Sequence, residues 1–114
     1  MATTQEVWEH HAGGFIGRDV AMVLEDYTEA SVLIENGEVY KGLEAIGAWF
    51  SNLFVALPKD CAFDLTNCTI LDDHIYITWT AESETLAIEF ATDTFAVKDG
   101  KITLQTIGVI KRSK

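Results

Sequence analysis

The sequence predicts a protein of the α+β class. Segments with apolar residues at helical spacing occupy most of the first half of the chain, and long segments of strand-forming residues fill the second half. Helices that come mainly first and antiparallel strands that come mainly last are typical of this class. The chain has 114 residues, a single proline and no internal repeat, so we expect one domain that spans residues 1–114.

Two helices are predicted before residue 30. Thr3 and Glu6 have the spacing of a capping box, which begins the first helix, and Gly17 is expected to end it. Asp19 is a favourable cap for the second helix. The apolar stripe of the first helix comprises Val7, Trp8, His11, Ala12 and Phe15. That of the second comprises Val20, Val23, Leu24 and Tyr27.

A short hairpin and a third helix follow. Residues 31–34 and 39–42 are predicted strands, joined at Asn36-Gly37, a pair that favours tight turns. Pro58 ends the third helix, because proline cannot continue the helical hydrogen bonds. The apolar side of this helix comprises Ile46, Trp49, Phe50, Leu53, Phe54 and Leu57.

The rest of the chain is predicted to be strand. The four segments are residues 61–71, 74–83, 86–97 and 101–110. The last two carry bulky apolar residues at both parities, so that Phe90 and Phe95 must face opposite sides of the sheet. A sheet that is apolar on both faces needs a cover on each. The helices cover one face, and we expect a second copy of the chain to cover the other in a homodimer.

Composition and charge exclude several classes of partner. Eighteen acidic and eight basic residues give a formal charge of −10, which opposes binding to nucleic acid or to an anionic membrane surface. No apolar run approaches the roughly 20 residues that cross a bilayer. The first residues lack the layout of a secretion signal. We therefore expect a cytoplasmic protein.

Metal binding is not expected. His10 and His11 are adjacent on a predicted helix, where neighbouring side chains point about 100° apart and cannot both grip one ion comfortably. Cys61 and Cys68 are too few for a zinc framework, and a single strand holds them too far apart to form a disulfide.

Asp93 interrupts the apolar strand "FATDTFAV" and is the leading candidate for a functional residue. It shares a face of that strand with Ala91, Phe95 and Val97. If this face lines a pocket, loss of water raises the pKa of the carboxyl and favours its neutral form, which donates a hydrogen bond. The alternative is a solvated Asp93 near the sheet edge, or one bonded to a neighbouring threonine.

Three stretches of the chain resemble the NTF2-like (SnoaL-like) superfamily. They are "DVAMVLEDYTEASVLI", "YKGLEAIGAWF" and "FATDTFAVKDGKITLQT", and the resemblance extends from about Val7 to Ile107. It implies a cone in which N-terminal helices pack into a curved, mainly antiparallel sheet around an apolar pocket. Many members dimerise through the outer face of the sheet. Activities vary widely across this fold, and they include ketosteroid isomerases and polyketide cyclases.

The resemblance to ketosteroid isomerase implies roles for three residues, and each has a simpler alternative. Asp93 matches the aspartic acid that donates to the oxyanion, and Glu35 matches the general base within one position. His11 takes the place of an oxyanion-hole tyrosine. Glu35 is also explained as a solvated residue beside the Asn36-Gly37 turn, and His11 as a hydrogen-bonded core histidine.

Five further residues are candidates for substrate contact. Trp79 shares the parity of Ile75 and Ile77, and is expected in the core or the pocket wall. Gln105 alternates with Thr103, Ile107 and Val109, where an amide either orients a ligand or is satisfied inside the protein. The remaining candidates are Phe95, Tyr27 and Trp49. Tyr27 is also explained as an ordinary core residue.

These observations favour a protein that binds a small apolar ligand or substrate without a cofactor. In the catalytic version, Glu35 removes a proton next to a carbonyl group while Asp93 and His11 stabilise the enolate, as in an isomerase or a cyclase. The alternative is a non-catalytic dimeric module that binds a ligand or a protein. Convergence of the three side chains on one cavity would favour the enzyme.

Overall fold

The computed structural model describes residues 1–114 and confirms the α+β class and the curved sheet. The helices are α1 (Thr4–Ile16), α2 (Val20–Leu24) and α3 (Gly42–Ala56). The strands are β1 (Val32–Glu35), β2 (Glu38–Lys41), β3 (Ala62–Leu71), β4 (His74–Glu82), β5 (Leu86–Lys98) and β6 (Lys101–Ser113). All six strands form one sheet in the order β2-β1-β6-β5-β4-β3, in which only β1 and β6 run parallel.

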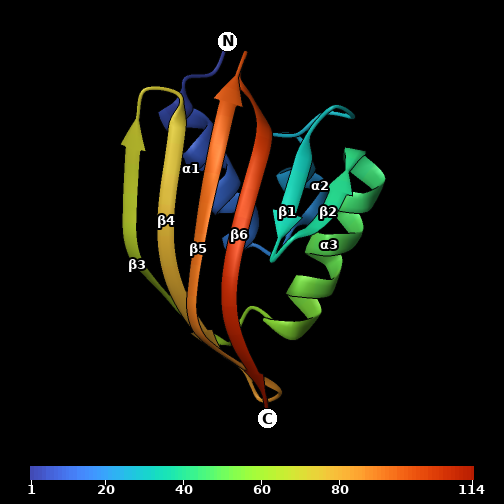
Figure 1. Cartoon of the computed structure of the whole chain (residues 1–114), viewed down its shortest axis with the longest axis vertical. Coiled ribbons are helices and arrows are strands. Elements are labelled where there is room, and N and C mark those ends of the chain that lie inside the picture. Colours follow the sequence, from blue (N-terminus) through green and yellow to red (C-terminus); the bar gives the residue numbers. More distant parts are fainter.

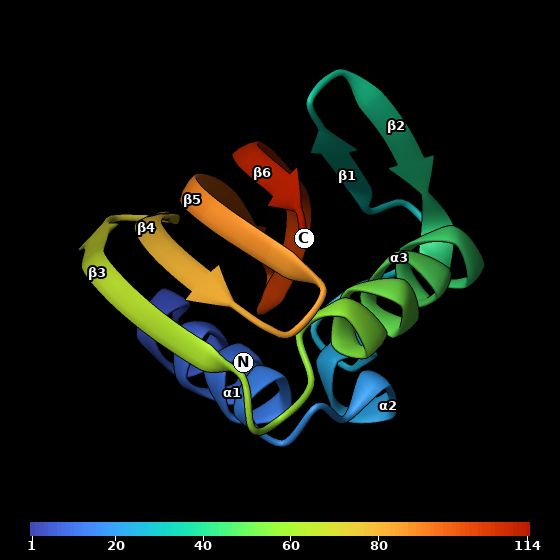
Figure 2. The same cartoon turned by 90° about the horizontal axis from the view of Figure 1, so that it is seen from below.

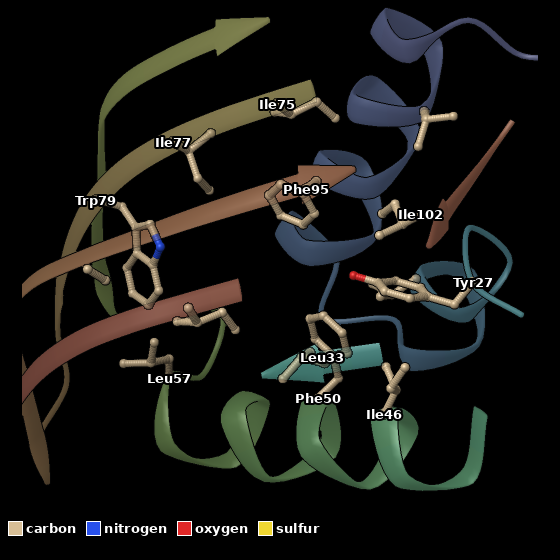
Figure 3. Close-up of a cluster of buried hydrophobic side chains, with 14 of the residues drawn as sticks. Tyr27, Leu33, Ile46, Phe50, Leu57, Ile75, Ile77, Trp79, Phe95 and Ile102 are labelled. Atoms are coloured by element: carbon tan, nitrogen blue, oxygen red, sulfur yellow. The ribbon is translucent and has the colours of Figure 1, made fainter. Parts of the chain in front are cut away.

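The helices cover one face of the sheet and leave the other bare. Strands β3 to β6 curve over α1, while α3 lies beside the β1–β2 hairpin (Figures 1 and 2). The buried apolar side chains fill the space between the helices and the concave, inner face (Figure 3). On the outer face, large apolar side chains remain exposed. They include Tyr76, Phe90, Leu104 and Ile110.

Local signals set the ends of most elements. The capping box is present, because the Glu6 amide donates to Thr3 Oγ1 at 3.1 Å and the Thr3 amide donates to Glu6 Oε1 at 2.8 Å. Asn36 and Gly37 both take positive φ, 47° and 90°, as a tight hairpin turn requires. The second helix is shorter than its apolar stripe predicts. It ends at Leu24, so Tyr27 lies in the connection to β1.

A β-bulge makes the alternation of side chains along β6 differ from the predicted one. A register shift opposite Ala96 and Val97 turns Thr103 outward and brings Ile102 to the inner face. Gln105 therefore shares its buried face with Ile102 and Ile107, and the expected alternation with Thr103 is wrong. No helix is both long enough and apolar enough to cross a membrane.

Candidate functional site

Asp93 lies in the middle of β5 on the inner face of the sheet. It pairs with Ile77 of β4 and with Ile107 of β6, and only 5% of its surface is exposed. The Trp79 indole donates from Nε1 to Asp93 Oδ1 at 2.9 Å, and the Gln105 amide donates from Nε2 to Oδ2 at 2.9 Å. Neighbouring strands therefore hold the carboxyl group in place by one hydrogen bond on each oxygen.

Tyr27 fixes the orientation of the Gln105 amide. The Tyr27 hydroxyl donates to Gln105 Oε1, so the amide nitrogen is left to face Asp93. Tyr27 and Gln105 are almost fully buried. Figure 3 shows Tyr27 and Trp79 on opposite sides of the core, with the hydroxyl and the indole nitrogen turned inward. The hydrogen-bonded chain Tyr27–Gln105–Asp93–Trp79 thus ties the connection before β1 to three strands.

Burial raises the pKa of Asp93 to about 6. The two hydrogen bonds from Trp79 and Gln105 oppose this rise, and the charge of Glu35 adds to it. No lysine or arginine is among the groups that act on Asp93. The carboxyl is therefore neutral below about pH 6, unlike an ordinary aspartate.

His11 is the second buried titratable group at this place. It projects from α1 with 5% of its surface exposed, and its ring centroid lies 5.0 Å from that of Phe95 and 5.9 Å from that of Phe50. Burial, with a smaller contribution from His10, lowers the pKa of His11 to about 4. His11 is thus neutral at pH 7. Its Nδ1 is buried and has no hydrogen-bond partner within the chain.

His11 and Asp93 line the same cavity, which we call the aromatic hollow. It has a volume of about 280 Å³ and lies between α1, α3 and the inner face of the sheet. Its apolar walls are Trp8, Ala12, Phe15, Ile16, Trp49, Phe50, Leu53, Phe63, Leu65, Ile77 and Trp79. Its remaining lining residues are His11, Asp93 and Gln105. Asp93 and Gln105 are hydrogen-bonded to each other, whereas the Nδ1 atom of the His11 imidazole has no hydrogen-bond partner.

Glu35 lines a neighbouring cavity of about 220 Å³, which we call the Glu35 hollow. The two hollows share three walls: Trp49, Leu53 and Trp79. The Trp49 indole donates from Nε1 to Glu35 Oε1 at 3.3 Å, a long hydrogen bond. Lys111, Tyr40 and Asn52 also line the Glu35 hollow. The three candidate catalytic residues therefore do not converge on one cavity: His11 and Asp93 line the aromatic hollow, and Glu35 lines the neighbouring one.

The candidate contact residues divide into two groups. Trp49, Trp79 and Gln105 line the aromatic hollow, and the last two also bind Asp93 directly. Phe95 and Tyr27 line neither hollow: Phe95 packs against His11, and Tyr27 binds Gln105. Sequence reasoning missed the contribution of β3 to the wall. The alternating Phe63 and Leu65 were the available signal for it.

His10 points away from the aromatic hollow. Its Nδ1 lies 2.8 Å from Asp26 Oδ2, and its Nε2 lies 3.1 Å from Glu25 Oε1. The hydrogen bond with Asp26 is the main reason that the pKa of His10 is raised. The side chains of the two adjacent histidines thus lie in different environments. No group of three or more His, Cys, Asp or Glu side chains is arranged to hold a metal ion.

A buried carboxyl group over an aromatic cavity, inside a curved sheet closed by helices, defines a pocket-bearing α+β protein. The SnoaL-like domain model matches residues 8–105, and the chain therefore belongs to the SnoaL-like family. A comparison with curated proteins finds no match.

Solved structures share the fold at low sequence identity. An NTF2-like protein of unknown function from Cytophaga hutchinsonii is 9% identical with a TM-score of 0.77, and the match covers 96% of this chain and 92% of that one. A candidate SnoaL-like polyketide cyclase from Jannaschia sp. CCS1 is 14% identical with a TM-score of 0.74, over 93% and 84% of the two chains. At these identities the likeness establishes the fold alone.

Proposed function

We propose that the chain binds a small apolar carbonyl compound in the aromatic hollow. We further propose that it promotes the enolisation of this compound, as an isomerase or a cyclase does, once a movement of the Trp49 side chain lets Glu35 reach the same cavity. The observation that carries this proposal is the position of Asp93, a buried acid at the polar end of a cavity with aromatic walls. Its raised pKa favours the neutral acid, which donates a hydrogen bond to a carbonyl oxygen.

The volume of the hollow suits a compact ligand. A cavity of 150 Å³ suffices for benzene, and pockets for drug-sized ligands begin near 300 Å³ by general experience. At about 280 Å³, the aromatic hollow matches a compound of one or two rings. Its apolar walls favour the hydrocarbon part, and His11 and Asp93 favour an oxygen at one end.

The proposed reaction moves one proton from carbon. Glu35 accepts the proton from the carbon next to the carbonyl group, and the electron pair of that C–H bond forms the enolate. Asp93 donates a hydrogen bond to the developing oxygen anion, and His11 adds a second donor when its proton is on the nitrogen that faces the ligand. Glu35 reaches the ligand once the Trp49 indole is displaced. The hydrogen bond that this displacement breaks is the long one between Trp49 and Glu35.

Exchange of carbon-bound protons tests this reaction directly. With 2-tetralone, a bicyclic ketone, we expect the protein to accelerate deuterium uptake beside the carbonyl in D₂O near pH 5, followed by NMR. Glu35→Gln removes the base and should lower the catalysed rate by about 10²–10⁴-fold. Glu38→Gln is the matched control, because Glu38 faces Glu35 across the hairpin but is exposed and lines neither hollow.

Binding of 2-tetralone without any catalysed exchange would favour the alternative, a non-catalytic ligand-binding module. A Glu35→Gln variant as active as the wild type would remove Glu35 from the mechanism and leave the pocket in place.

We also propose a homodimer formed through the outer face of the sheet. The exposed apolar side chains Tyr76, Phe90, Leu104 and Ile110 share this face, and Phe90 and Ile110 are paired on neighbouring strands. No helix covers the outer face of the sheet (Figures 1 and 2). Burial against the same face of a second copy would remove these side chains from water.

Light scattering coupled to size-exclusion chromatography tests the dimer. We expect twice the chain mass for the wild type and a single chain mass for Ile110→Glu, because an unpaired carboxylate would be buried in the interface. The matched control is Val55→Glu, which places the same change at an exposed position of α3. A wild type that runs as a monomer at high concentration would contradict the proposal.

A further inference from the structure

Asp93 is buried without a positively charged partner. Its two oxygens accept bonds from the indole of Trp79 and the amide of Gln105, both of them neutral groups. No lysine or arginine lines the aromatic hollow. A carboxylate removed from water is costly unless a positive charge compensates it. In its ionised form this site therefore lacks a counter-ion.

The other charges near the site do not supply one. His11 faces it from α1 and is neutral at pH 7, and Tyr27 faces it from the connection before β1 as an uncharged phenol. Glu35 of β1 contributes a second negative charge. Lys111 lines the Glu35 hollow instead, and the Arg18 guanidinium donates to the carbonyl groups of Phe15, Leu57 and Pro58. The chain as a whole carries −10, which attracts cations over a distance.

The walls of the hollow suit an organic cation. Aromatic rings from α1, α3, β3 and β4 line it, and they comprise Trp8, Phe15, Trp49, Phe50, Phe63 and Trp79. Several are held by contact with one another: the rings of Phe63 and Trp79 stack at 5.3 Å, and those of Phe15 and Phe63 lie 5.0 Å apart. The electron-rich faces of such rings attract ammonium groups, and aromatic cages recognise methylated ammonium ions in this way.

We propose that the aromatic hollow binds small quaternary or tertiary ammonium compounds, with the Asp93 carboxylate as their counter-ion and the rings as their cage. The inference shares the cavity of the proposed function, but it does not depend on catalysis or on Glu35. The methyl groups of the cation pack against the apolar walls, and its positive charge compensates the negative charge of the buried carboxylate.

The protonation state of Asp93 then selects between two ligand classes. The neutral acid donates to a carbonyl oxygen and offers nothing to a cation, whereas the ionised form attracts a cation and cannot donate. Since the pKa of Asp93 is raised to about 6, ammonium binding should strengthen as pH rises through 6, and ketone binding should weaken. The two ligand classes thus have opposite pH profiles in one cavity.

Isothermal titration calorimetry with a matched pair of probes tests the inference. Phenyltrimethylammonium and tert-butylbenzene have the same shape, and only the first is charged. At pH 8 we expect the wild type to bind the ammonium probe at least tenfold more tightly than the hydrocarbon. At pH 5 this preference should shrink severalfold. In Asp93→Asn, which keeps the shape of the side chain, the preference should fall at least severalfold at pH 8 and should no longer depend on pH between 5 and 8.

A second variant tests the contribution of the aromatic rings separately from that of the Asp93 charge. It also gives a readout if Asp93→Asn fails to fold. Phe63 is 38% exposed, so Phe63→Leu should leave the fold intact while it removes one ring of the cage. We expect this variant to bind the ammonium probe severalfold more weakly than the wild type does, and to bind the hydrocarbon with almost the same affinity.

Equal affinity of the wild type for the two probes at pH 8, or an undiminished preference in Asp93→Asn, would overturn the inference. Failure to bind the ammonium probe would also overturn it, and 2-tetralone exchange would still test the proposed function. Competition between 2-tetralone and the ammonium probe shows whether both occupy the same cavity. Independent binding of the two would place the cation elsewhere and contradict the assignment to Asp93.

Discussion

As pH rises from 4 to 7, the unfolding free energy of Asp93→Asn is expected to increase by about 2 kcal/mol relative to that of the wild type. The pKa of the Asp93 carboxyl rises from an ordinary value of 3.8 to about 6 in the folded protein. Over this pH range the folded state binds more protons than the unfolded state does, so wild-type stability falls as pH rises. Asparagine has no proton to lose, and the variant escapes this loss.

His11 produces the opposite dependence in nearly the same pH range. Burial lowers its pKa from 6.5 to about 4, so the unfolded state binds more protons and wild-type stability rises with pH. The size of this effect is about 3 kcal/mol. The two contributions therefore largely cancel in the wild type. Relative to the wild type, His11→Phe should lose about 3 kcal/mol of unfolding free energy as pH rises from 4 to 7.

Urea unfolding at intervals of half a pH unit measures how the unfolding free energy of each variant depends on pH. Differences between variant and wild type remove the contributions of all other titrating groups, and a fixed protein concentration removes any effect of association. Asp64→Asn is the matched control, since it makes the same substitution at an exposed position of β3. A flat curve for Asp93→Asn would mean that Asp93 is solvated in the folded protein, which would contradict both its burial and its proposed role.

Much of the fold was predictable because its signals are local. A capping box, an Asn-Gly turn and alternating side chains act within a few residues, and all three are found in the structure. The opposite orientation of Phe90 and Phe95 follows from the same alternation: Phe90 is 45% exposed and Phe95 is fully buried. The inward direction of Asp93 could be predicted from its parity with Phe95 for this reason.

The arrangement of the site depends on contacts that the sequence pattern does not reveal. Tyr27 and Gln105 are 78 positions apart, and nothing local indicates that one fixes the other. The register shift near Thr103 depends on the pairing of two whole strands. Trp49 lies on the predicted apolar side of α3, but its place in the walls of both hollows depends on how α3 packs against the sheet. Most of the site residues could therefore be named from the sequence. Their division between two separate hollows could not be predicted from it.

Asp93→Leu should lower the catalysed exchange of 2-tetralone by about 10²–10³-fold, the typical contribution of one oxyanion donor. Leucine is close to aspartate in shape but cannot donate a hydrogen bond to the enolate oxygen. It leaves the donors of Trp79 and Gln105 without an acceptor, and it also removes a buried acid. These effects on stability oppose each other, so we expect the variant to remain folded at pH 5, which far-UV circular dichroism checks.

Asp93→Asn is the informative partner of this variant. Its amide can still donate a hydrogen bond, so it should retain more activity than Asp93→Leu, and it should lose the dependence of the rate on pH near 6. In the wild type the rate should fall as pH rises through 6, because the ionised carboxyl cannot donate. If Asp93→Leu exchanged protons as fast as the wild type, Asp93 would not be the oxyanion donor. The aromatic hollow would then have to position the ketone without it.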